Sequence, residues 1–138
     1  MPSYLLTFDD SEVATVQAGP GEVIVCFAAA HVQQLDPAPP EGTPGDRPQG
    51  YVRHLVLHLA TMAGAPGAAL PPDLYGRIAA GGLGIDGRRW RQLAVPGEFS
   101  GELLLDLDFA NRSTLTLRAH AARLGFDGDP QFTESLAC

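Results

Sequence analysis

Four histidines are the residues of this chain best suited to bind a metal: His31, His54, His58 and His120. His54 and His58 form an H-x-x-x-H spacing, which on a helix would place both rings on one face about 6 Å apart. On a strand, four steps of about 3.3 Å separate the two rings by roughly 13 Å, too far for a single zinc ion. No third ligand is evident from the sequence, so we expect structural histidines and no metal site.

Other catalytic signatures are weak. Residues 82–87 match G-x-G-x-x-G, but no helix of adequate length follows them, so we expect no dinucleotide cofactor. All nine basic residues are arginine, which excludes Schiff-base and P-loop chemistry because both require a lysine amine. Cys26 lies in an apolar segment, where a thiol is usually inert packing. These observations lean against an enzyme, and a metal-dependent enzyme is the weakest alternative.

Four side chains are candidates for contacting a small ligand. We expect His31 and His54 to face each other across neighbouring strands, at the mouth of a barrel if one forms. Arg89 and Arg91 belong to a basic cluster. Because side chains alternate along a strand, both arginines would lie on one face and Trp90 on the other. Two such arginines would suit a small anionic ligand or an acidic partner. We expect Trp90 to lie in the core.

Charge and hydropathy limit the partners. Sixteen acidic residues outnumber nine arginines, and the formal charge of −7 repels phosphate backbones and anionic membranes. No apolar run approaches the roughly 20 residues of a membrane span, and the start of the chain lacks the features of a signal peptide. The absence of lysine, with abundant Ala, Gly and Pro, is typical of GC-rich bacterial genomes. We expect a bacterial, cytoplasmic protein that binds neither nucleic acid nor membrane.

Alternating hydrophobicity predicts strands. Every second residue from Leu103 to Phe109 is apolar, and after a turn about Arg112 the alternation resumes to residue 122. Folding this hairpin about Arg112 places Asp106 opposite Arg118, a favourable cross-strand pair. A second hairpin is predicted over 77–95, turning at the Asp-Gly pair 86–87, with Leu83 opposite Trp90 and a bulge near residues 91–92.

The segments 23–34 and 51–62 are harder to interpret. The first mixes helix-favouring and strand-favouring residues, and the sequence does not decide between the two. If both are strands, the register that sets His31 against His54 turns Ile24, Cys26 and Ala28 toward the core. The opposite face is also semi-apolar, which suggests central strands of a sheet or a face covered by another subunit.

Taken together, these patterns predict a single all-β domain spanning 1–138, with a Pro/Gly-rich loop at 36–50. About eight strands form an antiparallel β-sandwich or a small barrel, and the sandwich is our first expectation. The first functional hypothesis is a non-catalytic binding or assembly module that forms a homodimer through its semi-apolar face. The alternative is a small-ligand or carbohydrate-binding β-barrel.

Overall fold

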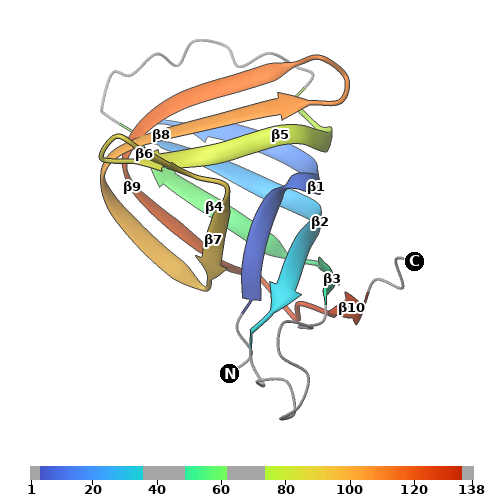
Figure 1. Cartoon of the computed structure of the whole chain (residues 1–138). Coiled ribbons are helices and arrows are strands. Elements are labelled where there is room, and N and C mark those ends of the chain that lie inside the picture. The colour runs from blue at the N-terminus through green and yellow to red at the C-terminus, as the bar shows by residue number, and fades with distance from the viewer. Residues whose placement is uncertain (1–3, 36–48, 62–73, 135–138) are drawn as a thin grey trace.

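A computed structural model describes residues 4–35, 49–61 and 74–134, and the regular elements in these ranges are β-strands (Figure 1). The predicted loop at 36–50 lies outside the described residues except for its last two positions, which begin a strand. The described ranges contain no helix that could span a lipid bilayer. The strands are β1 (Tyr4–Gly19), β2 (Glu22–Gln34), β3 (Gln49–Val52), β4 (Leu55–Ala60), β5 (Gly76–Ile85), β6 (Arg88–Trp90), β7 (Gln92–Val95), β8 (Gly97–Phe109), β9 (Thr114–Phe126) and β10 (Thr133–Glu134).

Six antiparallel strands close into a barrel in the order β1, β2, β4, β9, β8, β5 and back to β1. Closure occurs where β5 pairs with β1, at Arg77 opposite Glu12 and Gly76 opposite Val13. The shorter strands add to this framework: β3 extends from β2, β10 from β3, β7 from β1 and β6 from β5. The all-β prediction is confirmed. Of the two predicted architectures the barrel is the one adopted, because β1 pairs with both β2 and β5 and so joins the two ends of the strand order.

The interior of the barrel is filled by inward-facing apolar side chains. Alternate residues along each strand point inward, as the pleat of a strand requires. Several of these side chains have at most 1% of their surface exposed, which leaves no room for water beside them. They come from all six barrel strands and include Leu6, Phe8, Val25, Leu57, Ile78, Leu83, Leu105, Leu107 and Leu124.

The long strand β1 is irregular between Thr7 and Thr15, and two polar side chains hold this irregularity in place. The Ser11 hydroxyl is fully buried; it donates to the Thr7 carbonyl (2.7 Å) and accepts from the His31 amide (2.8 Å). The Asp9 carboxylate accepts from the Gly81 amide (3.1 Å) on β5. These contacts satisfy backbone groups that the irregular ladder leaves without strand partners.

The β8–β9 hairpin has the predicted faces but different partners. A hydrogen bond from Phe109 N to Ser113 O (2.8 Å) closes a three-residue loop that ends in Arg112, whose φ of 75° is left-handed. This loop places Asp106 opposite Thr116, so the predicted pairing with an arginine on β9 is wrong. Because the register differs by two residues, an even number, the inward and outward faces are unchanged.

The β5–β6 hairpin turns at Asp86 and Gly87, which have φ values of 50° and 89°, and it sets Leu83 opposite Trp90 as predicted. Residues 82–87 therefore belong to a strand and its turn, not to the start of a helix. Trp90, however, is 40% exposed, and its predicted place in the core is wrong. Beyond it the chain leaves β5 and pairs with β1 as β7, which buries Leu93 without requiring Trp90 to face inward.

Both uncertain segments are strands, but their predicted register is wrong. Cys26 faces Val56 across β2 and β4, whereas the predicted register places it against Leu59. The difference of three residues is odd, so it exchanges the two faces over the first half of β2, whereas Ala30 and Val32 are buried as the predicted face requires. Val25 points into the core, and Ile24 and Cys26, expected in the core, lie half-buried on the outer surface.

Candidate functional site

The two histidines predicted to form a ligand site do not face each other. His31 on β2 lies opposite Tyr51 of β3, with the ring centroids 5.4 Å apart. Its Nδ1 atom is buried and has no hydrogen-bond partner among the described residues. His54 is exposed in the bend between β3 and β4, at a left-handed φ of 63°. The predicted His31–His54 pairing is therefore wrong.

The two predicted arginines lie on another part of the barrel, Arg89 on β6, which pairs with β5 (Figure 1), and Arg91 in the bend between β6 and β7. Arg89 crosses the backbone of Gly82 and binds Asp106 of β8 through two hydrogen bonds of 2.6 and 3.3 Å. This pair is partly exposed and joins β6 to β8 across β5. Arg91 is exposed in the bend after β6. The structure does not bring these arginines to His31 or His54.

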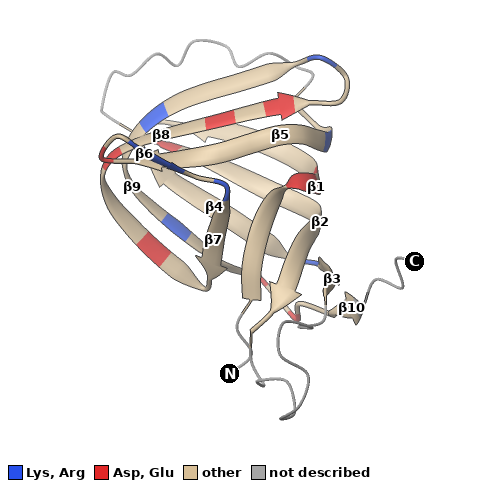
Figure 2. Ribbon diagram, in the orientation of Figure 1, with Lys and Arg blue, Asp and Glu red and all other residues tan. Residues whose placement is uncertain are grey.

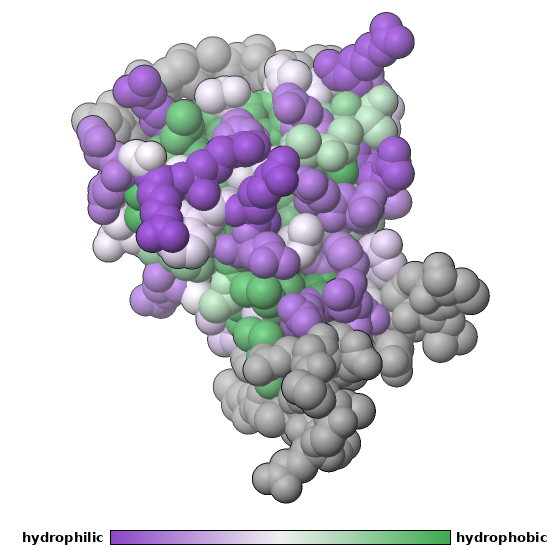
Figure 3. Space-filling view, viewed as in Figure 1, coloured by the Kyte–Doolittle hydropathy of each residue, from purple (hydrophilic) through white to green (hydrophobic). Residues whose placement is uncertain are grey.

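The surface around β6 and β8 is strongly polar. The charged residues of β6 are arginines and those of β8 are acidic (Figure 2), and hydrophilic residues dominate this side of the molecule (Figure 3). The guanidinium of Arg88 lies 4.4 Å from the centre of the Trp90 ring, so one face of the indole is already occupied. This region is a solvated surface.

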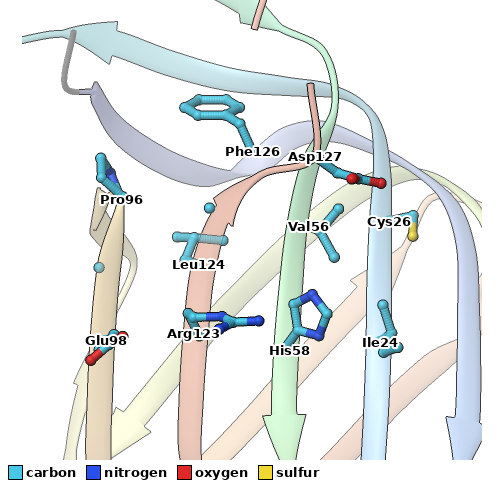
Figure 4. Close-up of a pocket in the computed structure, with 12 residues that line it drawn as sticks. Ile24, Cys26, Val56, His58, Pro96, Glu98, Arg123, Leu124, Phe126 and Asp127 are labelled. Atoms are coloured by element: carbon cyan, nitrogen blue, oxygen red, sulfur yellow. The ribbon is translucent and has the colours of Figure 1, made fainter. Parts of the chain in front are cut away.

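A groove of about 700 Å³ lies on the outer surface of the barrel, over β2, β4 and the end of β9 (Figure 4). The corner between β7 and β8 bounds one side of it. A second hollow of about 590 Å³ adjoins the groove and shares His58, Glu98 and Arg123 with it. The side chains that define the groove are Ile24, Cys26, Val56, His58, Arg123 and Phe126.

One row of the groove follows from the strand register. Ile24 pairs with His58, His58 with Arg123, and Arg123 with Glu98, so these residues lie side by side on β2, β4, β9 and β8. Arg123 and Glu98 are exposed, and His58 and Ile24 are half-buried. The row therefore runs from an apolar side chain through two nitrogen-bearing side chains to a carboxylate.

The next row supplies the apolar part of the groove. Cys26 pairs with Val56, and Val56 pairs with Gly125. A Cβ atom at Gly125 would meet no other atom within 4 Å, so the missing side chain contributes to the hollow over β9. Phe126, the next residue on β9, borders the groove beyond this row, and its ring packs against the core (Figure 4). The groove is thus lined by apolar side chains and the Cys26 thiol, and the nitrogen atoms of His58 and Arg123 lie in the adjoining row.

Arg123 supplies a positive charge to the groove. Within the described residues two salt bridges form, Arg77–Asp10 and Arg89–Asp106, and Arg123 belongs to neither. Its guanidinium extends across the groove toward the ring of His58, away from Glu98 (Figure 4). The two strands hold the base of each side chain in place, because Arg123 and His58 are direct partners in the sheet.

The aromatic wall of the groove is supported from the end of the barrel. The ring of Phe126 meets Tyr4 edge to face, with centroids 5.7 Å apart, and Phe132 stacks on Tyr4 at the same distance. Burial raises the pKa of Tyr4, and the negative charge of Asp129 raises it further. Such an aromatic cluster gives Phe126 a fixed position from which to contact a ligand.

Among the described residues, no three His, Cys, Asp or Glu side chains lie close enough together to hold a metal ion. The sequence indicated the semi-apolar outer face, because residues 23–28 are apolar on both sides. It did not indicate Arg123, whose place depends on the pairing of β2, β4, β9 and β8.

No family model matches this chain, and no curated protein or solved structure matches it either.

Proposed function

We propose that this protein is a non-catalytic binding module that holds its ligand in the groove on the outside of the barrel. The observation that carries this proposal is the outward direction of Ile24, Cys26 and Val56, which gathers apolar surface in a concave site. The outer residues of a strand in a water-exposed barrel are usually polar. Apolar hollows with a few polar groups at their centre are typical of ligand sites.

The position of the ligand distinguishes this proposal from the barrel type expected from the sequence. Barrels that bind small ligands commonly enclose them. Here Leu57, Leu105 and Leu107 fill the interior, with at most 1% of each side chain exposed. A carbohydrate or other small ligand inside the barrel would have to displace that core, whereas the groove is open to solvent.

Cys26 provides a direct test of the groove. In a Cys138→Ser background, Cys26 is the remaining thiol of the sequence, and it lines the groove. We expect saturating 1-octanol to slow its reaction with N-ethylmaleimide by about fivefold or more, because a bound apolar chain covers the sulfur. Labelling rates followed by mass spectrometry give the result.

The matched control for this experiment is a thiol on the outer surface away from the groove. Thr116→Cys, made with both native cysteines replaced by serine, places an exposed thiol on β9 at a position outside the groove lining. Octanol should leave its labelling rate unchanged. Equal effects of octanol at both thiols, or no effect at Cys26, would refute the proposed binding site.

A homodimer through the same face is the second candidate, and it was expected from the sequence. The half-buried Ile24 and Cys26 favour it, since a second copy would cover them. Sedimentation velocity at micromolar concentration separates the two candidates. A monomer leaves the groove free for a small ligand, and a dimer that an Ile24→Glu substitution dissociates assigns the face to assembly.

A further inference from the structure

We propose that the groove recognises a carboxylate with a short apolar tail, and that Arg123 binds the carboxylate. This inference rests on the proposed binding function and adds the chemical class of the ligand. It joins two features of the groove: an arginine without an ion-pair partner among the described residues and an apolar wall beside it.

The head-group site consists of Arg123 and His58. A guanidinium presents a fork of N–H donors that matches the two oxygens of a carboxylate. Arg123 directs this fork over the groove, and its nearest carboxylate in the sheet, Glu98, does not form a salt bridge with it. The imidazole of His58, at the next position in the row, offers a further nitrogen to the same head group (Figure 4).

The tail site runs along the strands from this head-group site. Phe126 borders the far end of the groove, about 10 Å along β9 from Arg123 and close to the length of an eight-carbon chain, and its ring packs against the core. Val56 and Cys26 line the path, and the bare backbone of Gly125 leaves space above it. The cavity volume of about 700 Å³ is in the range of small-ligand sites.

Acidic groups at the borders of the groove restrict the ligand further. Glu98 lies on β8 at one side, and Asp127 follows the end of β9. A ligand with several negative charges would bring one of them close to these carboxylates, which would weaken its binding. The groove therefore suits a single carboxylate rather than a nucleotide or a polyphosphate.

The experiment compares three probes with the same chain length: octanoate, 1-octanol and octylammonium. Protection of Cys26 from N-ethylmaleimide reports the dissociation constant of each in the Cys138→Ser background. We expect octanoate to bind about tenfold more tightly than octanol, since a charge-assisted contact of about 1.4 kcal/mol corresponds to a factor of ten. Octylammonium should bind most weakly.

Two variants locate the head-group site. Arg123→Gln should reduce the affinity for octanoate to that for octanol and leave octanol unchanged. Arg118→Gln, also exposed on β9 but outside the groove lining, makes the same change in net charge and should preserve the tenfold preference. Circular dichroism melting of both variants verifies that the fold is retained.

The outcomes separate this inference from the proposed function. Equal binding of octanoate and octanol by the wild type, tighter binding of octylammonium, or a preference that survives Arg123→Gln would overturn the carboxylate assignment while the groove remains a binding site. Failure of all three probes to protect Cys26 would instead contradict the proposed function itself.

Discussion

Replacement of Leu105 by alanine is expected to lower the free energy of unfolding by about 2–5 kcal/mol. Leu105 is 1% exposed in the barrel interior, so truncation removes buried apolar surface and leaves a cavity. The same truncation at its neighbour Leu104, which is 39% exposed on the outer surface, should change the free energy by only about 0.5 kcal/mol. Urea unfolding followed by circular dichroism measures both.

The Leu104–Leu105 comparison depends on face alone, because both residues lie on β8 and lose the same atoms. Equal destabilisation by the two substitutions would contradict the alternation of inward and outward residues. A larger effect at Leu104 would mean that the two faces of the strand are exchanged.

Gly81→Ala is the second substitution with a large expected effect, a loss of about 1–3 kcal/mol of stability through overpacking. A Cβ atom at Gly81 would lie 2.8 Å from Leu107 Cδ2, 3.1 Å from Phe8 Cβ and 3.3 Å from the Asp106 carbonyl oxygen. The leucine side chain has some freedom to move, but the other two neighbours are held by the core and by the backbone. Thermal or urea unfolding gives the change in stability.

Gly84→Ala, three residues further along β5, is the matched control. There the nearest atoms, Leu104 O and Cβ, lie at 3.5 and 3.6 Å, an ordinary contact distance. Loss of glycine flexibility in the unfolded chain should leave stability unchanged or raise it by up to about 1 kcal/mol. If Gly81→Ala left stability unchanged while Gly84→Ala lowered it, the result would contradict the packing of β5 against β8 and β1.

Alternation in the sequence was sufficient to predict the faces of β8 and β9 but not their partners. Leu105 and Leu107 are inward, as their spacing indicated. Their partners were misassigned because the three-residue loop ending in Arg112 is set by local backbone geometry, which composition does not specify. Asp106 consequently binds Arg89, a residue on a strand outside that hairpin.

The face of the first half of β2 was misassigned because both faces of that half are apolar. Val25 and Cys26 are equally acceptable in a core, so hydrophobicity could not choose the register. The bend at His54, which ends β3 and begins β4, also divides a segment that was expected to be one strand. The candidate pair of histidines depended on that register and was lost with it.

The groove itself was beyond sequence reasoning because it needs four strands in register. His58, Arg123 and Glu98 are 25 or more residues apart in the chain, and the barrel topology alone places them in one row. The exposure of Trp90 has a similar origin. The chain changes partners from β5 to β1 after this residue, an event that local alternation does not encode.

Amide NMR shifts during titration with octanoate test most directly whether the ligand binds in the groove. The largest changes are predicted at Cys26, Val56, Arg123 and Gly125, the outward-facing neighbours on β2, β4 and β9. The amide of Leu105, in the interior, should change little. Changes centred on interior residues or on Arg91, or no changes at saturating octanoate, would contradict a binding site on the outer surface of the barrel.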